Sequence, residues 1–346
     1  MNLSRGECFI ARRGKFAARA HHGNPSTDTR LAATMRAATI RDGEIVIAQH
    51  PDPQPGKDEV LVRVRAAGLN GADMMQRRGL YPAPPGWPQD IPGLEIAGEV
   101  VENGPGASRF DTGARVMAIV GGGGQAELSV VHERMLMPVP QQLGWPQAGG
   151  FPEVFATAHD ALFTQAGLQA GERLLVHGGA GGVGTAAIQL GVSTGARVTA
   201  TVRNADNREQ VAQLGATAIE PDGFEQHGPF DAILELVGAP NLGANVDALA
   251  TSGRIVVIGI AAGAKGELNL AKLMYKRGRL MASTMRARPL EEKALMTRGL
   301  ERHVLPLLES GAVAVPVAET FPLDEAPAAY ERFAAGGKLG KLVLLP

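Results

Sequence analysis

The sequence contains very little cysteine, few aromatic residues and almost no net charge. Cys8 is the only cysteine among 346 residues, which excludes an internal disulfide and a zinc lobe built from four thiolates. Aromatic residues make up 4% of the chain, which disfavours an aromatic-rich β-sandwich. The formal net charge of -1 gives no electrostatic reason to expect nucleic acid or an anionic membrane as the main partner.

Long apolar runs are absent as well. No stretch approaches the roughly 20 uncharged apolar residues that span a bilayer, so we expect a soluble protein. A chain that forms no internal disulfide fits a reducing compartment, and we expect the cytoplasm. Glycine, in contrast, is abundant at 45 residues, and apolar residues make up 45%. This composition favours an α/β fold with tight turns and close helix–strand contacts, and the length favours two domains.

Residues 1–34 differ in composition from the rest of the chain. They carry six Lys or Arg residues but only two acidic ones, Glu7 and Asp28. Such a basic segment resembles a transit peptide, but a disordered tail or an upstream start before a true start at Met35 fits it too. We interpret residues 1–34 as a disordered extension outside the folded domains.

Along the rest of the chain, the secondary-structure pattern of the sequence changes twice. Residues 35 to about 151 hold short β-branched runs such as "EVLVRVRAAG", whose alternation predicts an antiparallel, partly open β-barrel. Residues 152 to 287 alternate strand and helix patterns, which predicts a doubly wound parallel sheet with right-handed crossovers. The final segment returns to strand, helix and strand. We predict one domain from residues 35–155 and 288–346, and a Rossmann domain from residues 156–287.

A glycine-rich loop opens the second of these domains. The stretch "GAGGVG" matches G-x-G-x-x-G, and it follows a predicted strand and precedes a predicted helix, as the dinucleotide-binding motif requires. Its glycines permit the tight turn, the approach of a pyrophosphate to the backbone and close helix–strand packing. The alternative is a tight structural turn without a ligand. The residues predicted to cradle the cofactor are Gly179, Gly181, Gly182, Val183 and Gly184.

The end of the next strand bears on which dinucleotide binds. An NAD site usually places an Asp or Glu there to bond the ribose 2′-hydroxyl, but this chain reads "TVRNAD", with no acid before Asp206. Arg203 suits a 2′-phosphate through charge-assisted bonds, and Arg208 is a second candidate. With Thr201 at the strand end, we predict an NADPH site. The alternative is that Arg203 is an ordinary surface charge.

Five stretches carry a family resemblance: "GLNGADMMQRRGLYPAPPG", "GGGGQAELSVV", "HGGAGGVGTAAIQL", "YKRGRLMASTMRAR" and "GKLGKLVL". From Met35 to Pro346 the chain resembles the medium-chain dehydrogenase/reductase superfamily. Within it, the resemblance is to the zinc-free NADPH:quinone oxidoreductases, particularly their tumour-suppressor-inducible branch. The resemblance implies a GroES-like catalytic domain beside the Rossmann domain, NADPH in the cleft between them, and a homodimer.

The resemblance also bears on metal. Zinc-dependent relatives carry C-x-x-D where Asn70 to Asp73 stand, and G-H-E where Gly93 to Glu95 stand. Glu153 falls near the third ligand position, but a catalytic zinc needs about three protein ligands. We therefore expect no metal and direct hydride delivery to an electron-poor acceptor.

The remaining site residues are implied by the resemblance. It places Asn70 and Tyr81 as catalytic residues beside the nicotinamide, although Asn70 also suits the N-cap of the helix "ADMMQRR" and Tyr81 a packed loop. Lys338 lies within reach of the cofactor phosphates or is simply exposed, and the glycines from Gly121 to Gly124 form a flexible cleft wall. The other cofactor-binding residues implied are Thr157, Gly259, Ile260, Ala261, Thr284 and Met285.

The sequence thus predicts an NADPH-dependent reductase of quinones or related enones, with small-molecule partners only. One alternative is an enoyl reductase of the same superfamily, in which Tyr81 donates the proton that carbon–carbon double-bond reduction requires. Another is a non-catalytic NADPH-binding protein with a structural or RNA-associated role. The near-neutral charge gives the latter little support.

Overall fold

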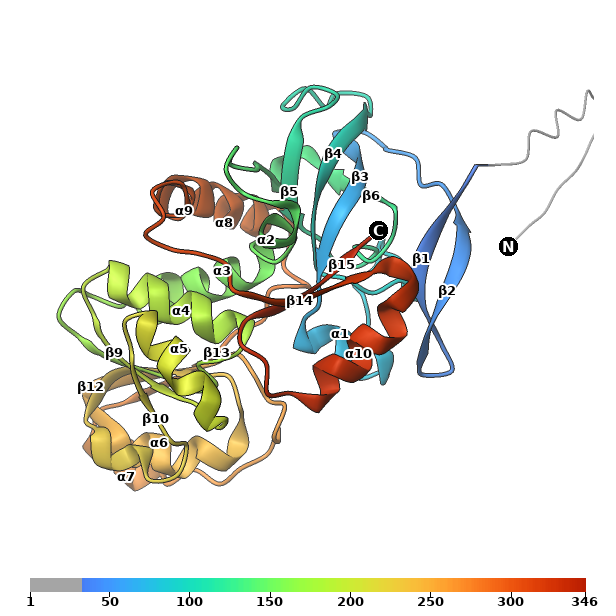
Figure 1. The fold of residues 1–346 in the computed structure, drawn as a ribbon. Helices are drawn as coiled ribbons and strands as arrows, with labels where there is room; N and C mark the ends of the chain where they lie inside the picture. Colours follow the sequence, from blue (N-terminus) through green and yellow to red (C-terminus); the bar gives the residue numbers. More distant parts are fainter. Residues whose placement is uncertain (1–32) are drawn as a thin grey trace, which may run out of the picture. The chain divides into compact units, whose positions relative to one another are not determined.

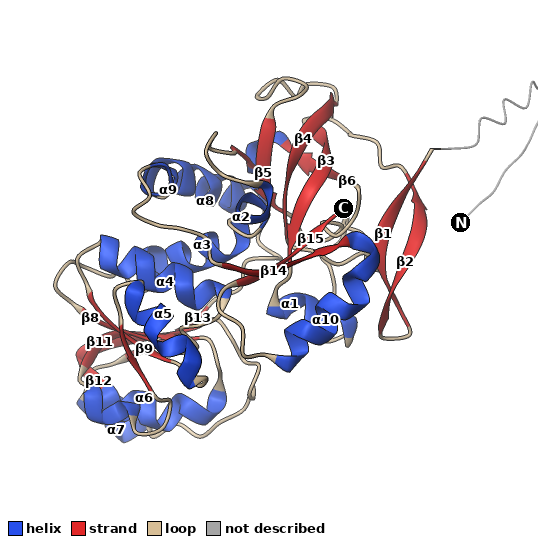
Figure 2. Cartoon of the chain, in the orientation of Figure 1, coloured by secondary structure: helices blue, strands red, loops and turns tan. Residues whose placement is uncertain are grey.

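The computed structural model describes residues 33–346. Residues 1–32 of the predicted extension, Cys8 among them, therefore lie outside the described residues. Two large sheets and a small hairpin organise the described part (Figures 1 and 2). The hairpin pairs β1 (Thr34–Arg41) with β2 (Glu44–Pro51). None of the helices in residues 33–346 is long and apolar enough to cross a membrane.

The larger sheet is formed from both ends of the chain. Its strands run in the order β14-β15-β3-β4-β5-β7, with β6 pairing β3, and every pairing is antiparallel except β14 with β15. The predicted alternation holds in β3, where Val62 and Val64 are buried and Arg63 and Arg65 exposed. The strand bounds are β3 (Glu59–Gly68), β4 (Glu95–Asn103), β5 (Arg115–Ile119), β6 (Leu128–His132), β7 (Leu136–Pro138), β14 (Val317–Pro322) and β15 (Lys341–Leu345).

The second sheet is wholly parallel, with the order β10-β9-β8-β11-β12-β13. The chain winds outward in both directions from β8 and β11, so the crevice at their carboxyl ends is the switch point where such sheets bind ligands. The strands are β8 (Arg173–Val176), β9 (Arg197–Thr201), β10 (Thr217–Ile219), β11 (Phe230–Glu235), β12 (Leu249–Val257) and β13 (Arg279–Ala282).

Helices cover the parallel sheet and flank the antiparallel one (Figure 2). Those attached to the parallel sheet are α4 (Gly182–Ser193), α5 (Arg208–Gln213), α6 (Leu242–Ala248) and α7 (Leu270–Tyr275). The others are α1 (Gly71–Arg77), α2 (Trp145–Gly149), α3 (Pro152–His159), α8 (Leu290–His303), α9 (Leu305–Glu309) and α10 (Ala326–Ala335). A π-helical stretch, Asp160–Gln165, continues α3.

Helix α3 joins the two sheets into one hydrophobic core. Its Phe151 and Phe155 rings stack 4.7 Å apart, and both side chains are fully buried. They belong to a single cluster that extends from Met117 of β5 to Leu174 of β8 and Ile188 of α4. The start of α3 is therefore held firmly between the two sheets, beside the loop that leaves β8.

Candidate functional site

The glycine loop lies at the switch point of the parallel sheet. It leaves β8 after Val176, and α4 begins at Gly182 with Gly181 as an extended N-cap that carries no capping side chain. A Cβ on Gly184 would lie 2.3 Å from the Gly178 carbonyl oxygen, whereas one on Gly181 would meet nothing nearer than 3.4 Å. Gly184 therefore serves packing, and Gly181 leaves open space beside the unpaired N–H groups at the start of α4, which favour an anion. These residues fit a dinucleotide pyrophosphate.

A buried polar network supports this loop from beneath. His177, the first residue of the loop, bonds Thr201 Oγ1 through Nδ1 at 3.1 Å and Asn245 Oδ1 through Nε2 at 2.8 Å. Asn245 donates in turn to Glu235, whose other oxygen accepts from the N–H groups of Val237 and Gly238. Thr201, predicted to bind cofactor, thus points inward and fixes the loop. No local pattern predicts this role of His177, because its partners Thr201 and Asn245 are far away in the chain.

The two predicted arginines at the end of β9 lie in different surroundings. Arg203 is exposed beside the turn Gly336–Gly340, its Nη2 being 3.4 Å from where a Cβ on Gly336 would lie. Arg208 instead forms a 2.8 Å ion pair with Glu220 and donates to the Val202 carbonyl. Arg203 is therefore free to meet a phosphate, whereas Arg208 already has a carboxylate partner.

The turn Gly336–Gly340 closes over the glycine loop. The Gly340 N–H donates to the Ala180 carbonyl at 2.8 Å, and Asn207 donates to the Gly337 carbonyl at 3.2 Å. Lys338 in this turn is half-buried rather than exposed, with its ammonium 4.7 Å from the Phe333 ring centroid. Burial, aided by the charge of Lys341, lowers the pKa of Lys338 to about 7. A phosphate bound here would reverse that effect by stabilising the ammonium.

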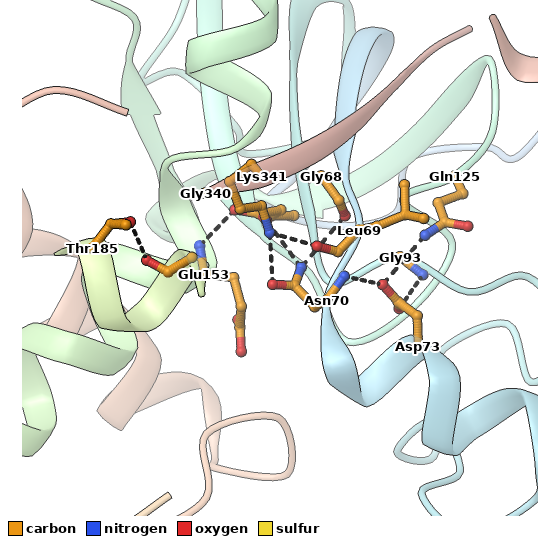
Figure 3. Close-up of polar contacts among 12 residues, drawn as sticks. Gly68, Leu69, Asn70, Asp73, Gly93, Gln125, Glu153, Thr185, Gly340 and Lys341 are labelled. Carbon is orange, nitrogen blue, oxygen red and sulfur yellow. Dashed lines mark hydrogen bonds and ion pairs between the residues drawn. The ribbon is translucent and has the colours of Figure 1, made fainter. Parts of the chain in front are cut away.

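Asn70 caps helix α1, as the sequence allowed, but its side chain belongs to a second cluster (Figure 3). Its Nδ2 donates to Glu95 Oε1 at 2.9 Å, and its Oδ1 accepts from Lys341 Nζ at 2.8 Å. Lys341 also pairs with Glu95 at 2.6 Å, and the side chains are 3% and 0% exposed. Asp73 has a structural role, since it accepts from Asn70 N, Gly93 N and Gln125 Nε2.

Among the carboxyl groups of this cluster, only that of Glu153 has a buried oxygen without a hydrogen-bond partner in residues 33–346. Its backbone N–H donates to Glu95 Oε2 at 2.9 Å, but its own Oε2 is shielded from solvent and has no hydrogen-bond partner in residues 33–346. Burial raises the pKa of Glu153 to about 8, and the charge of Glu95 acts in the same direction. A protonated carboxylic acid therefore lies here at neutral pH.

Tyr81 borders the same region through Arg286. The Arg286 guanidinium lies 5.3 Å from the Tyr81 ring centroid and donates to the Tyr81 and Gly121 carbonyls at 2.7 Å each. Burial raises the pKa of the Tyr81 hydroxyl. Residues Gly121 to Gly124 are all buried, and a Cβ on Gly121 would meet the Trp87 indole at 2.6 Å. The expected flexible wall is thus a closely packed one.

The remaining predicted residues lie at strand and helix ends. A Cβ on Gly259 would lie 2.2 Å from the Leu236 carbonyl oxygen, whereas Ile260 and Ala261, which follow β12, are exposed. Thr284 is exposed and Met285 buried, beyond the end of β13. Thr157 is buried in the second turn of α3. The cofactor-binding roles of these residues stay predictions.

The cluster of Lys341, Glu95 and Asn70 does not fit a metal ion. A lysine ammonium occupies its centre, within 2.8 Å of both Asn70 Oδ1 and Glu95, and its charge repels a cation. Across residues 33–346, no three His, Cys, Asp or Glu side chains are grouped to hold a metal ion.

Comparison with known proteins decides the family. Residues 56–141 match the model of the alcohol dehydrogenase GroES-like domain, and residues 209–344 match that of the zinc-binding dehydrogenase. The quinone oxidoreductase of Rattus norvegicus is 30% identical, covering 85% of this chain and 91% of that protein. The chain belongs to the medium-chain dehydrogenase/reductase family. It is an oxidoreductase, and the predicted fold class, a GroES-like domain with a Rossmann domain, is confirmed.

Further members of the family share the whole architecture. The quinone oxidoreductase of Pseudomonas aeruginosa is 31% identical, covering 91% of this chain and all of that one (100%). A mycobacterial protein complexed with NADPH superimposes with a TM-score of 0.81 at 25% identity, covering 90% of this chain and 100% of that one. An NAD-dependent alcohol dehydrogenase gives 0.80 at 27% identity, with the same coverage of 90% and 100%. These neighbours support a nicotinamide cofactor for this dehydrogenase/reductase.

Sequence reasoning overlooked Glu95 and Lys341 at this family site. In the sequence, Glu95 stands out only as the end of the stretch Gly93 to Glu95, and Lys341 only as part of "GKLGKLVL". A lysine that starts an apolar strand, "KLVLL", was the available signal, because a buried lysine requires a buried partner.

Proposed function

We propose that the protein is an NADPH-dependent quinone oxidoreductase that reduces quinones or related electron-poor carbonyl compounds without a metal. The observation that carries this proposal is the Lys341–Glu95–Asn70 cluster, which fills the polar centre of the site with an ammonium. A site of this kind supplies no Lewis acid to activate an alcohol, so it suits an acceptor that is already electron-poor. Relatives named quinone oxidoreductase support the same substrate class.

Two groups of residues would hold the cofactor. The bare backbone of Gly181 to Gly184 would bind the pyrophosphate, and the strand ends at Gly259 to Ala261 would border the nicotinamide. When bound, the nicotinamide supplies the hydride. The protein's task is then to orient the acceptor, exclude water and donate hydrogen bonds to its developing negative charge.

Selection of NADPH over NADH is the finer part of the proposal. Arg203 is exposed and has no carboxylate partner in the described residues, so it would bind the 2′-phosphate. Lys338 lies in the adjoining turn, where the negative charge of a phosphate would raise the lysine's lowered pKa and so favour its ammonium form. No acidic residue that would repel a 2′-phosphate stands between the end of β9 and Asp206. The backbone N–H of Asp206 donates to Asn204 Oδ1.

An acceptor screen tests the proposal. The purified protein is assayed for NADPH oxidation with 1,4-benzoquinone, naphthoquinones and a crotonyl thioester. The proposal predicts turnover with the quinones and little with the thioester. A clear preference for the thioester would replace it with an enoyl reductase, and background rates with every acceptor despite NADPH binding would leave only a binding protein.

The domain division and the assembly state remain part of the proposal. Residues 35–155 and 288–346 would form the catalytic domain and residues 156–287 the Rossmann domain, a division supported by which strands share each sheet. A homodimer would form along β13, the edge of the parallel sheet, where the exposed apolar side chains of Leu270, Met274 and Leu280 gather on β13 and the preceding α7. Light scattering in solution measures this state. We also propose a cytoplasmic location.

A further inference from the structure

We propose that Glu153 is the proton donor of this site, its carboxylic acid giving a proton to the acceptor oxygen as hydride arrives. The inference rests on the proposed function, because it assigns the second hydrogen of a two-electron quinone reduction. It starts from a carboxyl oxygen that is held out of solvent and has no hydrogen-bond partner in residues 33–346, on a residue whose backbone N–H is tied to Glu95.

The backbone around Glu153 is held rigidly. Its N–H is tied to Glu95 Oε2 at 2.9 Å, and Glu95 is itself anchored by Asn70 and Lys341. The next residue, Val154, is buried, and its Cγ1 lies 2.9 Å from where a Cβ on Gly182 would be. Glu153 therefore precedes a residue that contacts the start of α4, where the cofactor pyrophosphate would bind.

The side chain itself is left without a partner. In Figure 3 the Glu153 carboxyl carries no dashed line and extends away from the Lys341 ammonium. A polar atom shut off from water normally has a hydrogen-bond partner, and a buried one without any calls for an explanation. The oxygen of an acceptor bound beside Glu153 would be that partner.

Burial keeps the Glu153 carboxyl protonated, against surrounding charges of both signs. Glu95 of β4 and Asp73 of α1 oppose its ionisation, whereas Lys341 of β15 and Arg286 favour it. Tyr81 and Lys293 of α8 also face it. Burial outweighs these charges and places the pKa of Glu153 at about 8, which suits a general acid near neutral pH.

Neighbouring groups are less able to give a proton. The Lys341 ammonium already donates to three acceptors: Leu69 O, Asn70 Oδ1 and Glu95. Asp73 is committed to three donors, and burial raises the pKa of Tyr81 above that of an ordinary phenol, making it a weaker acid. Glu153 alone among these combines a held proton with a free oxygen.

The step balances as one hydride and one proton. A hydride from bound NADPH, which would be oxidised to NADP⁺, would add two electrons to the quinone and give an anionic hydroquinone. The O–H bond of Glu153 breaks as a new O–H bond forms on the acceptor oxygen, giving the neutral hydroquinone and a Glu153 carboxylate. Oε2 is shielded, but the residue as a whole is half-buried, so solvent would return the proton to the carboxylate after product leaves.

The test compares wild type with Glu153→Gln, and with Glu209→Gln, an exposed glutamate of α5, as the matched control. The first readout needs no cofactor: the δ-carbons of ¹³C-labelled glutamate are titrated by NMR. We expect one resonance with a midpoint near pH 8 in wild type and in the control, and its absence from Glu153→Gln. No resonance titrating above pH 6 would overturn the inference.

The second readout is the pH profile of kcat with a quinone. Wild type should lose activity as pH rises through about 8. Glu153→Gln should be about 100-fold slower and pH-independent in this range, the usual cost of removing a general acid. Glu153→Asp, which keeps the acid, should retain the pH dependence at a reduced rate, and unchanged NADPH affinity would show that each variant is folded.

The outcomes separate the two proposals. A Glu153→Gln enzyme that turns over quinones at the wild-type rate with the wild-type pH profile would overturn the proton donor and leave the proposed function standing. A wild-type enzyme that reduces no quinone, while the NMR titration appears as expected, would overturn the proposed function instead.

Discussion

The substitution Lys341→Met removes the cation from the most deeply buried ion pair of the site. Lys341 lies 2.6 Å from Glu95, and their side chains are 3% and 0% exposed. The lysine also donates to Leu69 O at 2.7 Å and to Asn70 Oδ1 at 2.8 Å. Without it, the Glu95 charge stays buried with only the Asn70 amide and the Glu153 N–H as donors. Breaking one side of a buried pair costs about 3–5 kcal/mol in the free energy of unfolding.

Urea unfolding, followed by the fluorescence of the two tryptophans, measures that cost. The matched control is Lys272→Met, which breaks an ion pair of the same length, 2.6 Å, whose side chains are 52% and 44% exposed. A surface pair contributes at most about 1 kcal/mol, so the two variants should differ clearly. The double variant Lys341→Met/Glu95→Gln, which leaves no unpaired charge, should recover part of the loss. A Lys341→Met protein as stable as the Lys272→Met protein would refute this reasoning.

Three further predictions concern the glycine loop, the phosphate site and the free carboxyl. Gly184→Ala should abolish NADPH binding in a fluorescence titration, because its Cβ would lie 2.3 Å from the Gly178 carbonyl oxygen; unchanged affinity would contradict the cradle. Arg203→Ala should weaken NADPH binding by about 10- to 100-fold and leave NADH unaffected, since a charged hydrogen bond contributes roughly 1.5–3 kcal/mol. Arg197→Ala, at the other end of β9, should change neither affinity in the same calorimetric titrations. The pKa of Glu153 is raised from 4.5 to about 8, so its stabilising contribution is complete below pH 4.5 and is lost as pH rises through 8. Relative to Glu153→Gln, wild type should therefore lose up to about 5 kcal/mol across this window, and parallel stability–pH curves would rule the shift out.

Features encoded by neighbouring residues were predictable from the sequence. The run from β8 through the glycine loop, α4 and β9 lies where the pattern placed it, and Asn70 caps α1 as expected. In these segments strand periodicity, glycine spacing and cap preference all act over a few residues. Local pattern and global fold agree there, so local reasoning was sufficient.

Features set by distant partners were not predictable. Lys341 and Asn70 are 271 positions apart in the chain, and His177 and Asn245 are 68 apart, so no local periodicity signals either contact. The sequence left Lys338 either within reach of the cofactor phosphates or simply exposed, and only the fold shows that its turn packs against Phe333 and the glycine loop. Arg208 matched the pattern of a phosphate ligand as well as Arg203 did, and only the fold shows that Glu220 pairs with it.

The measurement that most directly tests the central claim is NADPH oxidation by 1,4-benzoquinone after chelation, with residual metal determined by mass spectrometry. If the Lys341–Glu95–Asn70 cluster replaces any catalytic metal, the metal-stripped protein will keep its full turnover rate. Turnover that disappears on stripping and returns with one equivalent of zinc would contradict the account.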